Sequence, residues 1–204
     1  MSVEPFSADQ QDALQEIANL AMGRAGAVLA EMLDVYIELS VPRVAIVEAG
    51  GLTPEVEALT GRDSQVAAVR QPFMDGVSGE ALALFGEGGC RGLADLLGHD
   101  SVDETVEREL LLDVSNILLG SVLRGLGEHT ATRLSLGRPA IMSMGSPVAR
   151  LLNAEDLIWD QALMLEVNFR LDARGFACHL LLLMPEQSIE TMRHAVDRIL
   201  DGLG

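Results

Sequence analysis

The sequence predicts a fold of the α/β (α+β) class that is built from two similar halves. Two long segments, residues 7–33 and 105–126, carry apolar side chains at the spacing of an amphipathic helix. Each of these segments is followed by β-branched stretches typical of strands and by a short helical stretch. A shift of 97 residues, which carries Asp12 onto Glu109, brings the two series into register. The sequence therefore predicts a pseudo-twofold arrangement in which helices cover pooled strands.

Length and composition favour a single domain. The chain has 204 residues, of which 49% are hydrophobic and 3% aromatic, and such a chain can bury a sizeable core. We therefore expect one domain over residues 1–204, with its halves at about 7–98 and 104–204.

The first half is expected to begin with the helix at 7–33, for which Ser7 can serve as the N-cap. After Asp34 the pattern becomes alternating and β-branched, which predicts strands. The side of the helix expected to be buried carries Leu14, Ile17, Ala21, Val28, Leu29 and Met32. The elements expected next are strands at 35–41 and 44–47, a short helix at 54–59, strands at 65–70 and 79–85, and a short helix at 90–97.

The second half is expected to repeat this series, beginning with the helix at 105–126. The elements expected next are a strand at 140–142, a short helix at 147–153, strands at 162–171 and 176–184, and a last helix at 185–203. The pattern does not say how the strands of the two halves pair.

The strongly acidic composition excludes several classes of partner. A net charge of -17, from 31 acidic residues against 14 Lys and Arg, leaves no basic surface for phosphates or anionic lipid. Nucleic acid and membrane surfaces are therefore not expected as partners. The purest apolar run, residues 180–184, is far shorter than the roughly 20 residues that a bilayer requires. Because no Lys or Arg precedes Arg24, the N-terminus is unlike a secretory signal, and a cytoplasmic protein is expected.

One side of the first helix carries a row of polar residues, Asp12, Glu16 and Asn19, followed by Gly23. The first three lie within roughly 60° of one another around the helix axis, because their spacing is i, i+4 and i+7. Gly23 comes next in the row and has no side chain to obstruct an approaching surface. We call these four residues the first ridge and expect it to face solvent or a partner.

The shift of 97 residues carries the first ridge onto Glu109, Asp113, Asn116 and Gly120, which we call the second ridge. A repeated core needs only its apolar periodicity, so an acid, an acid, an amide and a glycine kept in register on a polar face indicate a function. An ordinary solvated helix face is the alternative. The four histidines show no metal-ligand spacing, so no metal site is expected.

The pattern Asp12-x3-Glu16-x2-Asn19, followed by 22 residues and Pro42, resembles the signature of the CheC, CheX and FliY chemotaxis phosphatases. The run of residues 16–25 also resembles the same helix of that family. The duplicated layout and the chain length are most similar to CheC. The resemblance implies a pseudo-two-fold, duplicated CheC-like fold over essentially the whole chain.

The resemblance also implies a reaction, the hydrolysis of the aspartyl phosphate on a response regulator such as phosphorylated CheY. Asn19 would orient the attacking water, because a carboxamide offers both a donor and an acceptor. Glu16 would form a charge-assisted contact with the regulator's lysine. Asp12 would support the helix or the interface. The Mg²⁺ ion belongs to the regulator, so no cofactor is expected in this chain.

The second ridge departs from the family pattern. Asp113 replaces the signature Glu and withdraws its carboxylate by about 1.5 Å, which matters where catalysis depends on position. With Asn116 retained, we expect this site to be weakened or to serve binding alone. Some family members bind the deamidase CheD, but no residue here identifies such a partner. The alternative function is a non-catalytic adaptor that binds the regulator; a structural flagellar switch component is less favoured.

Overall fold

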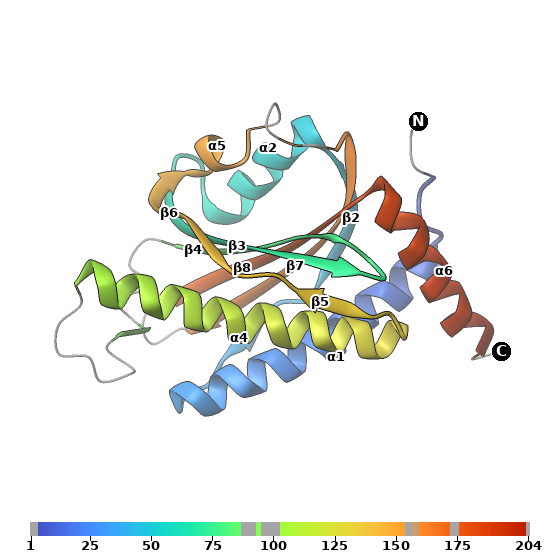
Figure 1. Ribbon diagram of the computed structural model, residues 1–204, viewed down its shortest axis with the longest axis horizontal. Coiled ribbons are helices and arrows are strands. Elements are labelled where there is room, and N and C mark those ends of the chain that lie inside the picture. Colours follow the sequence, from blue (N-terminus) through green and yellow to red (C-terminus); the bar gives the residue numbers. More distant parts are fainter. Residues whose placement is uncertain are drawn as a thin grey trace.

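The computed structural model describes residues 4–86, 93–94, 103–153, 157, 159–171 and 176–202. In this part of the chain, one eight-stranded sheet lies between two layers of helices (Figure 1). The helices are α1 (Ala8–Leu33), α2 (Ala49–Thr60), α4 (Glu104–Thr130), α5 (Val148–Leu151) and α6 (Glu186–Gly202). The strands are β1 (Glu38–Leu39), β2 (Arg43–Glu48), β3 (Gln65–Asp75), β4 (Gly79–Phe85), β5 (Leu134–Leu136), β6 (Ala140–Pro147), β7 (Gln161–Leu171) and β8 (Phe176–Pro185).

The predicted mixed fold is confirmed, and the strand order explains how the strands pool. The order is β1-β7-β8-β4-β3-β5, with β2 also paired to β7 and β6 also paired to β3. The sheet reads the same from either edge when β1 is exchanged with β5, β2 with β6, β7 with β3 and β8 with β4. Two similar halves would produce this order, and their origin from one duplicated unit stays a prediction.

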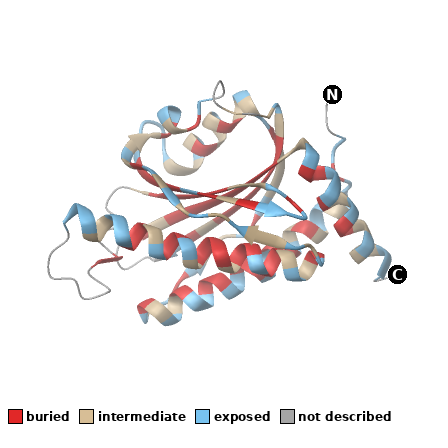
Figure 2. Ribbon diagram, in the orientation of Figure 1, coloured by how far each residue is buried: buried red, intermediate tan, exposed pale blue. Residues whose placement is uncertain are grey.

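The residues of β7 divide the hydrophobic core between the two faces of the sheet. Leu163 and Leu165 belong to a larger cluster with α1, α4 and α6, whereas Ala162 and Met164 join a smaller cluster with α2 and α5. This alternation follows from the two-residue period of a strand. Figure 2 shows the buried residues along the sheet and on the inner sides of the helices.

The first helix begins as the sequence predicts. Ser7 is its N-cap and forms a capping box with Gln10: Ser7 Oγ accepts from Gln10 N over 3.2 Å, and Ser7 N donates to Gln10 Oε1 over 2.9 Å. The helix ends where Asp34 adopts a left-handed conformation with φ 52°. The cap fixes the register of α1, and with it the direction of every residue on the first ridge.

Two residues expected on the buried side of α1 are not fully buried: Val28 is 45% exposed, and Met32 is half-buried. Toward its C-terminal end the helix buries Leu29 as expected, but also Gly26 and Leu33, and Gly26 lies against Leu39 of β1. The helical period predicts the buried residues correctly only where the covering elements lie on the same side along the whole helix. On α1 that direction turns toward β1, so the Val28 side is left uncovered.

Several predicted boundaries also change. The strand expected at 35–41 is reduced to the two residues of β1, and β5 was not predicted at all. Helix α2 begins five residues before the predicted start at Pro54, while α5 is shorter than its prediction. Of the helix expected at 90–97, only Leu93 and Ala94 lie within the described residues, and both are helical and buried.

Helix α4 is the one described helix that is long and apolar enough to cross a bilayer by length and composition. Its most apolar window has a mean hydropathy of 1.4, and 67% of that window is buried inside the fold. The helix packs beside α1 under the sheet, so its apolar surface belongs to the core of the domain (Figure 1). The cytoplasmic location stays a prediction.

Candidate functional site on the first long helix

The first ridge lies on the outer side of α1, as predicted. Asp12, Glu16, Asn19 and Gly23 are all exposed, while Leu14 and Ala21 of the same helix are fully buried. Within the described part of the chain, no hydrogen bond or ion pair engages the side chains of Asp12, Glu16 or Asn19. A Cβ atom placed on Gly23 would meet nothing within 4 Å. The ridge is therefore open to an approaching molecule.

The three polar residues of the ridge form one wall of a pocket of about 280 Å³, and Val41 and Pro42 form the other. Gln15 joins the two walls, because its Nε2 donates to the carbonyl oxygen of Pro42 over 3.0 Å. The signature proline, separated from Asn19 by 22 residues, is thus beside the ridge in space. Sequence reasoning found Pro42 but missed both Gln15 and Val41.

Pro42 belongs to a bulge at the edge of the sheet. Leu39 pairs with Phe169, and Arg43 pairs with Glu166, so four steps along this edge face three steps along β7. The extra residue in 40–42 pushes the chain outward, as in a β-bulge. We call these three residues the first bulge. The side chain of Val41 at its centre is 75% exposed.

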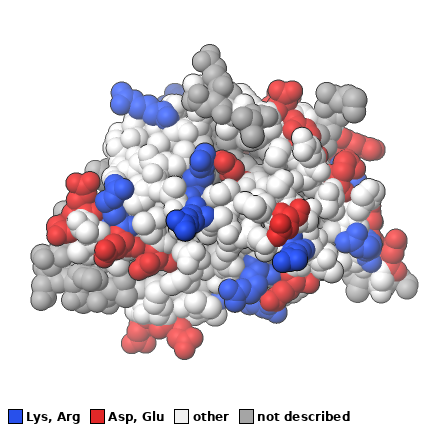
Figure 3. All heavy atoms as spheres, viewed as in Figure 1, with Lys and Arg blue, Asp and Glu red and all other residues white. Residues whose placement is uncertain are grey.

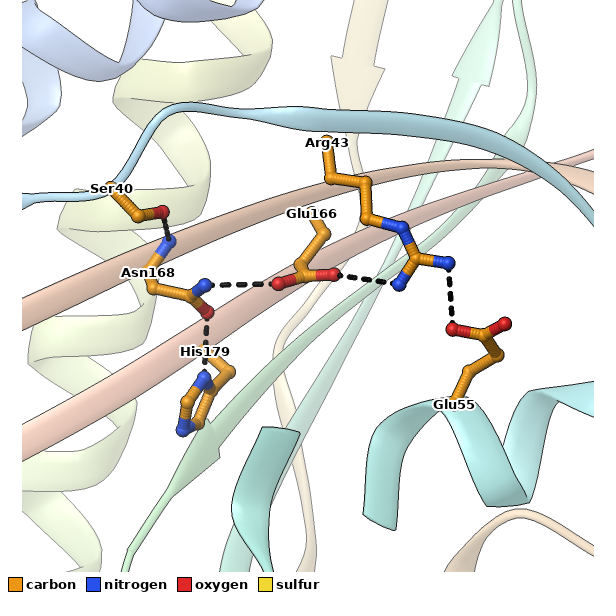
Figure 4. A network of polar contacts seen from close by, with 6 residues as sticks. All are labelled: Ser40, Arg43, Glu55, Glu166, Asn168 and His179. Carbon is orange, nitrogen blue, oxygen red and sulfur yellow. Dashed lines mark hydrogen bonds and ion pairs between the residues drawn. The ribbon is translucent and has the colours of Figure 1, made fainter. Parts of the chain in front are cut away.

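A polar network on the other face of the sheet holds the start of the first bulge (Figure 4). Ser40 N donates to the carbonyl oxygen of Asn168 over 3.1 Å, and Ser40 Oγ accepts from Asn168 N over 3.2 Å. The Oδ1 atom of Asn168 accepts from Nδ1 of the buried His179 over 2.6 Å. Burial, and then the nearby Arg170 cation, lowers the pKa of His179 below its ordinary value.

The same network holds the residue that follows the bulge. Glu166 accepts from Asn168 Nδ2 over 2.9 Å and pairs with Arg43 over 3.5 Å. Arg43 also pairs with Glu55 of α2 over 2.6 Å (Figure 4). The bulge is therefore anchored at Ser40 and Arg43 from one face of the sheet, and at Pro42 from the other.

The second half contains a matching bulge. Leu136 of β5 pairs with Phe73, and Ala140 of β6 pairs with Arg70, again four steps against three. Residues 137–139 form this second bulge. Its Pro139 stands at the position that the shift of 97 residues gives to Pro42, so both halves place a proline at this point.

The second bulge is held differently, and this changes the second ridge. Gln71, a fully covered residue of β3, donates from Nε2 to the carbonyl oxygen of Gly137 over 3.0 Å and to Asn116 Oδ1 over 3.4 Å. Asn116 is exposed but is bound to the protein itself. The corresponding strand residue in the first half is Val167, which follows Glu166 as Gln71 follows Arg70, and it has no polar group to bind Asn19.

The second ridge is also less open than predicted. Glu109 and Asp113 are exposed as expected, but Gly120 is buried, and a Cβ atom there would lie 3.6 Å from Leu136 Cδ1. The expectation that Gly120 lies on an open face is wrong, because β5, an element that the sequence did not predict, covers it. Leu112 stands at the position of Gln15, so no helix donor reaches the second bulge.

The charges around the fold are interspersed. On the face shown in Figure 3, acidic and basic groups lie beside each other at several places, with uncharged surface between them. Within the residues that the structure describes, no group of three His, Cys, Asp or Glu side chains is placed to hold a metal ion. The chemistry open to the first ridge is thus that of one carboxylate pair and one carboxamide.

Comparison with known proteins supports the reading of this helix. The family model of the CheC-like family matches residues 10–46, which contain the first ridge, Gln15 and the first bulge. Across the fold, the chain is similar to FliY from Thermotoga maritima with a TM-score of 0.73 and 14% identity, covering 96% of this chain and 99% of that one. Residues 10–46 thus match the CheC-like family model, and the chain as a whole shares the fold of FliY. The predicted resemblance to CheC, CheX and FliY is confirmed.

Two further structures show how widely this CheC-like fold is used. The chain is similar to the FliM middle domain from H. pylori, with a TM-score of 0.63 and 11% identity over 93% of this chain and 99% of that one. It is also similar to the CheX-CheY-BeF3-Mg²⁺ complex from Borrelia burgdorferi, with a TM-score of 0.53 and 17% identity over 83% and 96%. At these identities the likeness concerns the fold alone.

Proposed function

We propose that this protein is a phosphatase that hydrolyses the aspartyl phosphate of a CheY-like response regulator in chemotaxis or a related two-component pathway. The observation that carries the proposal is the state of the first ridge. Glu16 and Asn19 are exposed in one pocket, and no group among the described residues binds their side chains. If this helix served packing alone, it would not need two polar side chains without hydrogen-bond partners at these positions.

The reaction requires little of the phosphatase beyond orienting the attacking water and the regulator. The regulator supplies the aspartyl phosphate, its Mg²⁺ and a lysine, so the missing element is an aligned water. The Asn19 carboxamide would hold that water for in-line attack on phosphorus. The phosphorus–oxygen bond to the aspartate then breaks, and inorganic phosphate and the free carboxylate are released. Glu16 would bind the regulator's lysine and fix the angle of approach.

The similarity to a structure of CheX with CheY supports the choice of partner, since that complex pairs a protein of this fold with CheY in the presence of BeF3 and Mg²⁺. A net charge of -17 would repel an acidic regulator at long range, so binding would depend on local contacts. The interspersed charges in Figure 3 fit this expectation. A CheD-like partner has no supporting observation here.

A non-catalytic adaptor is the second candidate, and the second ridge favours it. Gln71 binds the Asn116 carboxamide, and Asp113 is one methylene shorter than the signature Glu. The similarity to the FliM middle domain also shows that the fold is not tied to one family of the chemotaxis proteins. In this reading the chain would hold the regulator without speeding the loss of phosphate.

Binding and turnover measured on the same regulator separate the two candidates. The regulator is loaded with BeF3 and Mg²⁺ for binding, and phosphorylated with acetyl phosphate for turnover. A phosphatase shortens the lifetime of the phosphorylated regulator, and Glu16→Gln weakens both readouts. The matched control is Glu31→Gln, because Glu31 is exposed on the same helix but does not line the pocket. Tight binding with an unchanged lifetime would establish the adaptor.

A further inference from the structure

The hydrogen bond between Gln15 and Pro42 is not needed to attach the first bulge to the fold. Gln15 is half-buried and its side chain crosses from α1 to the carbonyl oxygen of Pro42 over 3.0 Å. The first bulge is already anchored from the opposite face of the sheet at Ser40 and Arg43. What Gln15 adds is a fixed distance between the bulge and the ridge.

The distance between the bulge and the ridge determines the position of Val41. It lies between the two anchored ends of the bulge, it lines the pocket, and its side chain is 75% exposed. Leu20, which follows Asn19 on the helix, is 45% exposed. Two exposed apolar side chains thus accompany the polar pair Glu16 and Asn19, as expected of a docking surface with apolar contacts around a polar centre.

We propose that Gln15 is a positioning residue: it holds the first bulge against α1, so that Val41 makes an apolar contact with the docked regulator beside Glu16 and Asn19. This inference rests on the proposed function and names the part of the site that governs docking. Gln15 and Val41 touch neither the phosphate nor the water. Their loss should weaken the encounter of the two proteins and leave the chemical step in place.

The second half shows what the arrangement becomes without this glutamine. Leu112 stands at the position of Gln15, and Arg138 stands at the position of Val41. The second bulge is held instead by Gln71 from the sheet, and the same glutamine binds Asn116. A glutamine on the helix thus leaves the ridge amide open, whereas a glutamine on the strand occupies it.

The test uses kinetics of the phosphorylated regulator with three variants. Gln15→Leu copies the residue of the second half, and we expect KM to rise about fivefold with kcat nearly unchanged, since one neutral hydrogen bond is lost. Val41→Ala should also raise KM and spare kcat. Gln15→Lys keeps a donor long enough to reach the Pro42 carbonyl and should restore most of the affinity that Gln15→Leu loses.

The matched control is Gln11→Leu, the same substitution one turn earlier on the same helix, at an exposed residue that does not line the pocket. Thermal unfolding of each variant checks that the domain stays folded. An unchanged KM in Gln15→Leu, or an equal rise in Gln11→Leu, would overturn the inference. A fall in kcat alone would also overturn it, because it would place Gln15 in the chemical step. If the native chain leaves the lifetime of the phosphorylated regulator unchanged, the proposed function itself is wrong. If the native chain shortens that lifetime but Gln15→Leu does not raise KM, only the positioning role of Gln15 is wrong.

Discussion

Gln71 on β3 donates from its Nε2 to the Oδ1 of Asn116 on α4, over 3.4 Å. The equivalent pair in the first half is Val167 and Asn19, between which no such bond can form. Gln71 is 1% exposed, and its Oε1 atom is buried without a hydrogen-bond partner among the described residues. The two ridges therefore differ in the availability of their carboxamides as well as in their acids.

The state of Asn116 predicts the effect of Gln71→Leu. The substitution removes two hydrogen bonds and one unpartnered oxygen, so the free energy of unfolding should change by only about 1 kcal/mol. In an Asn19→Ala background, the uncovered Asn116 should raise binding of the BeF3- and Mg²⁺-loaded regulator about fivefold. Adding Asn116→Ala should abolish this gain. No gain at all would show that Asp113, with its shorter side chain, limits the second ridge.

The crossing of the two long helices predicts opposite effects for two glycines. A Cβ atom on Gly125 of α4 would lie 2.7 Å from Ala21 Cβ, so Gly125→Ala should lower the free energy of unfolding by about 1–3 kcal/mol. Gly23 has open space around it, so Gly23→Ala should raise that free energy by roughly 0.5–1 kcal/mol through helix propensity. Chemical denaturation measures both. Equal effects in the two variants would mean that the helices do not cross closely at Ala21.

The buried His179 predicts a loss of stability in mild acid. Because its pKa is lowered in the folded state, the unfolded chain takes up a proton first as the pH falls. The stabilisation is present above the unfolded pKa of about 6.5 and is lost between that value and the lower folded pKa. Thermal unfolding at pH 7.5 and 5.5 should show this decline in the native chain. His179→Gln should start lower at pH 7.5 and decline less, and an equal decline would contradict the assignment.

The first ridge could be predicted from the sequence because one helix contains it. Asp12, Glu16 and Asn19 share a face through the helical period alone, and Ser7 fixes where the helix begins. The helical period predicted the wrong exposure for Val28, which is exposed, and for Gly120, which is buried. Exposure at these positions depends on where β1 and β5 pack against the helices. Local patterns cannot report where a separate element packs.

The bulges and the glutamines that hold them could not be predicted. The first bulge exists because β1 and β2 pair with β7, more than a hundred residues away, and loop patterns carry no such register. Gln71 offered one signal that was not used: it is a polar residue on the strand face that also carries the apolar Val69 and Phe73, one position beyond the predicted end of that strand. Gln15 offered none before Pro42 was known to lie beside it.

The most direct test of the account measures the loss of phosphate from a phosphorylated response regulator of the same organism, with Mg²⁺ present. The native chain is compared with Asn19→Ala and Asn116→Ala. We expect the native chain to accelerate the loss, Asn19→Ala to reduce that acceleration by about a hundredfold, and Asn116→Ala to retain most of it. An unchanged decay rate, at native concentrations where binding of the regulator is demonstrated, would contradict the phosphatase and leave the adaptor.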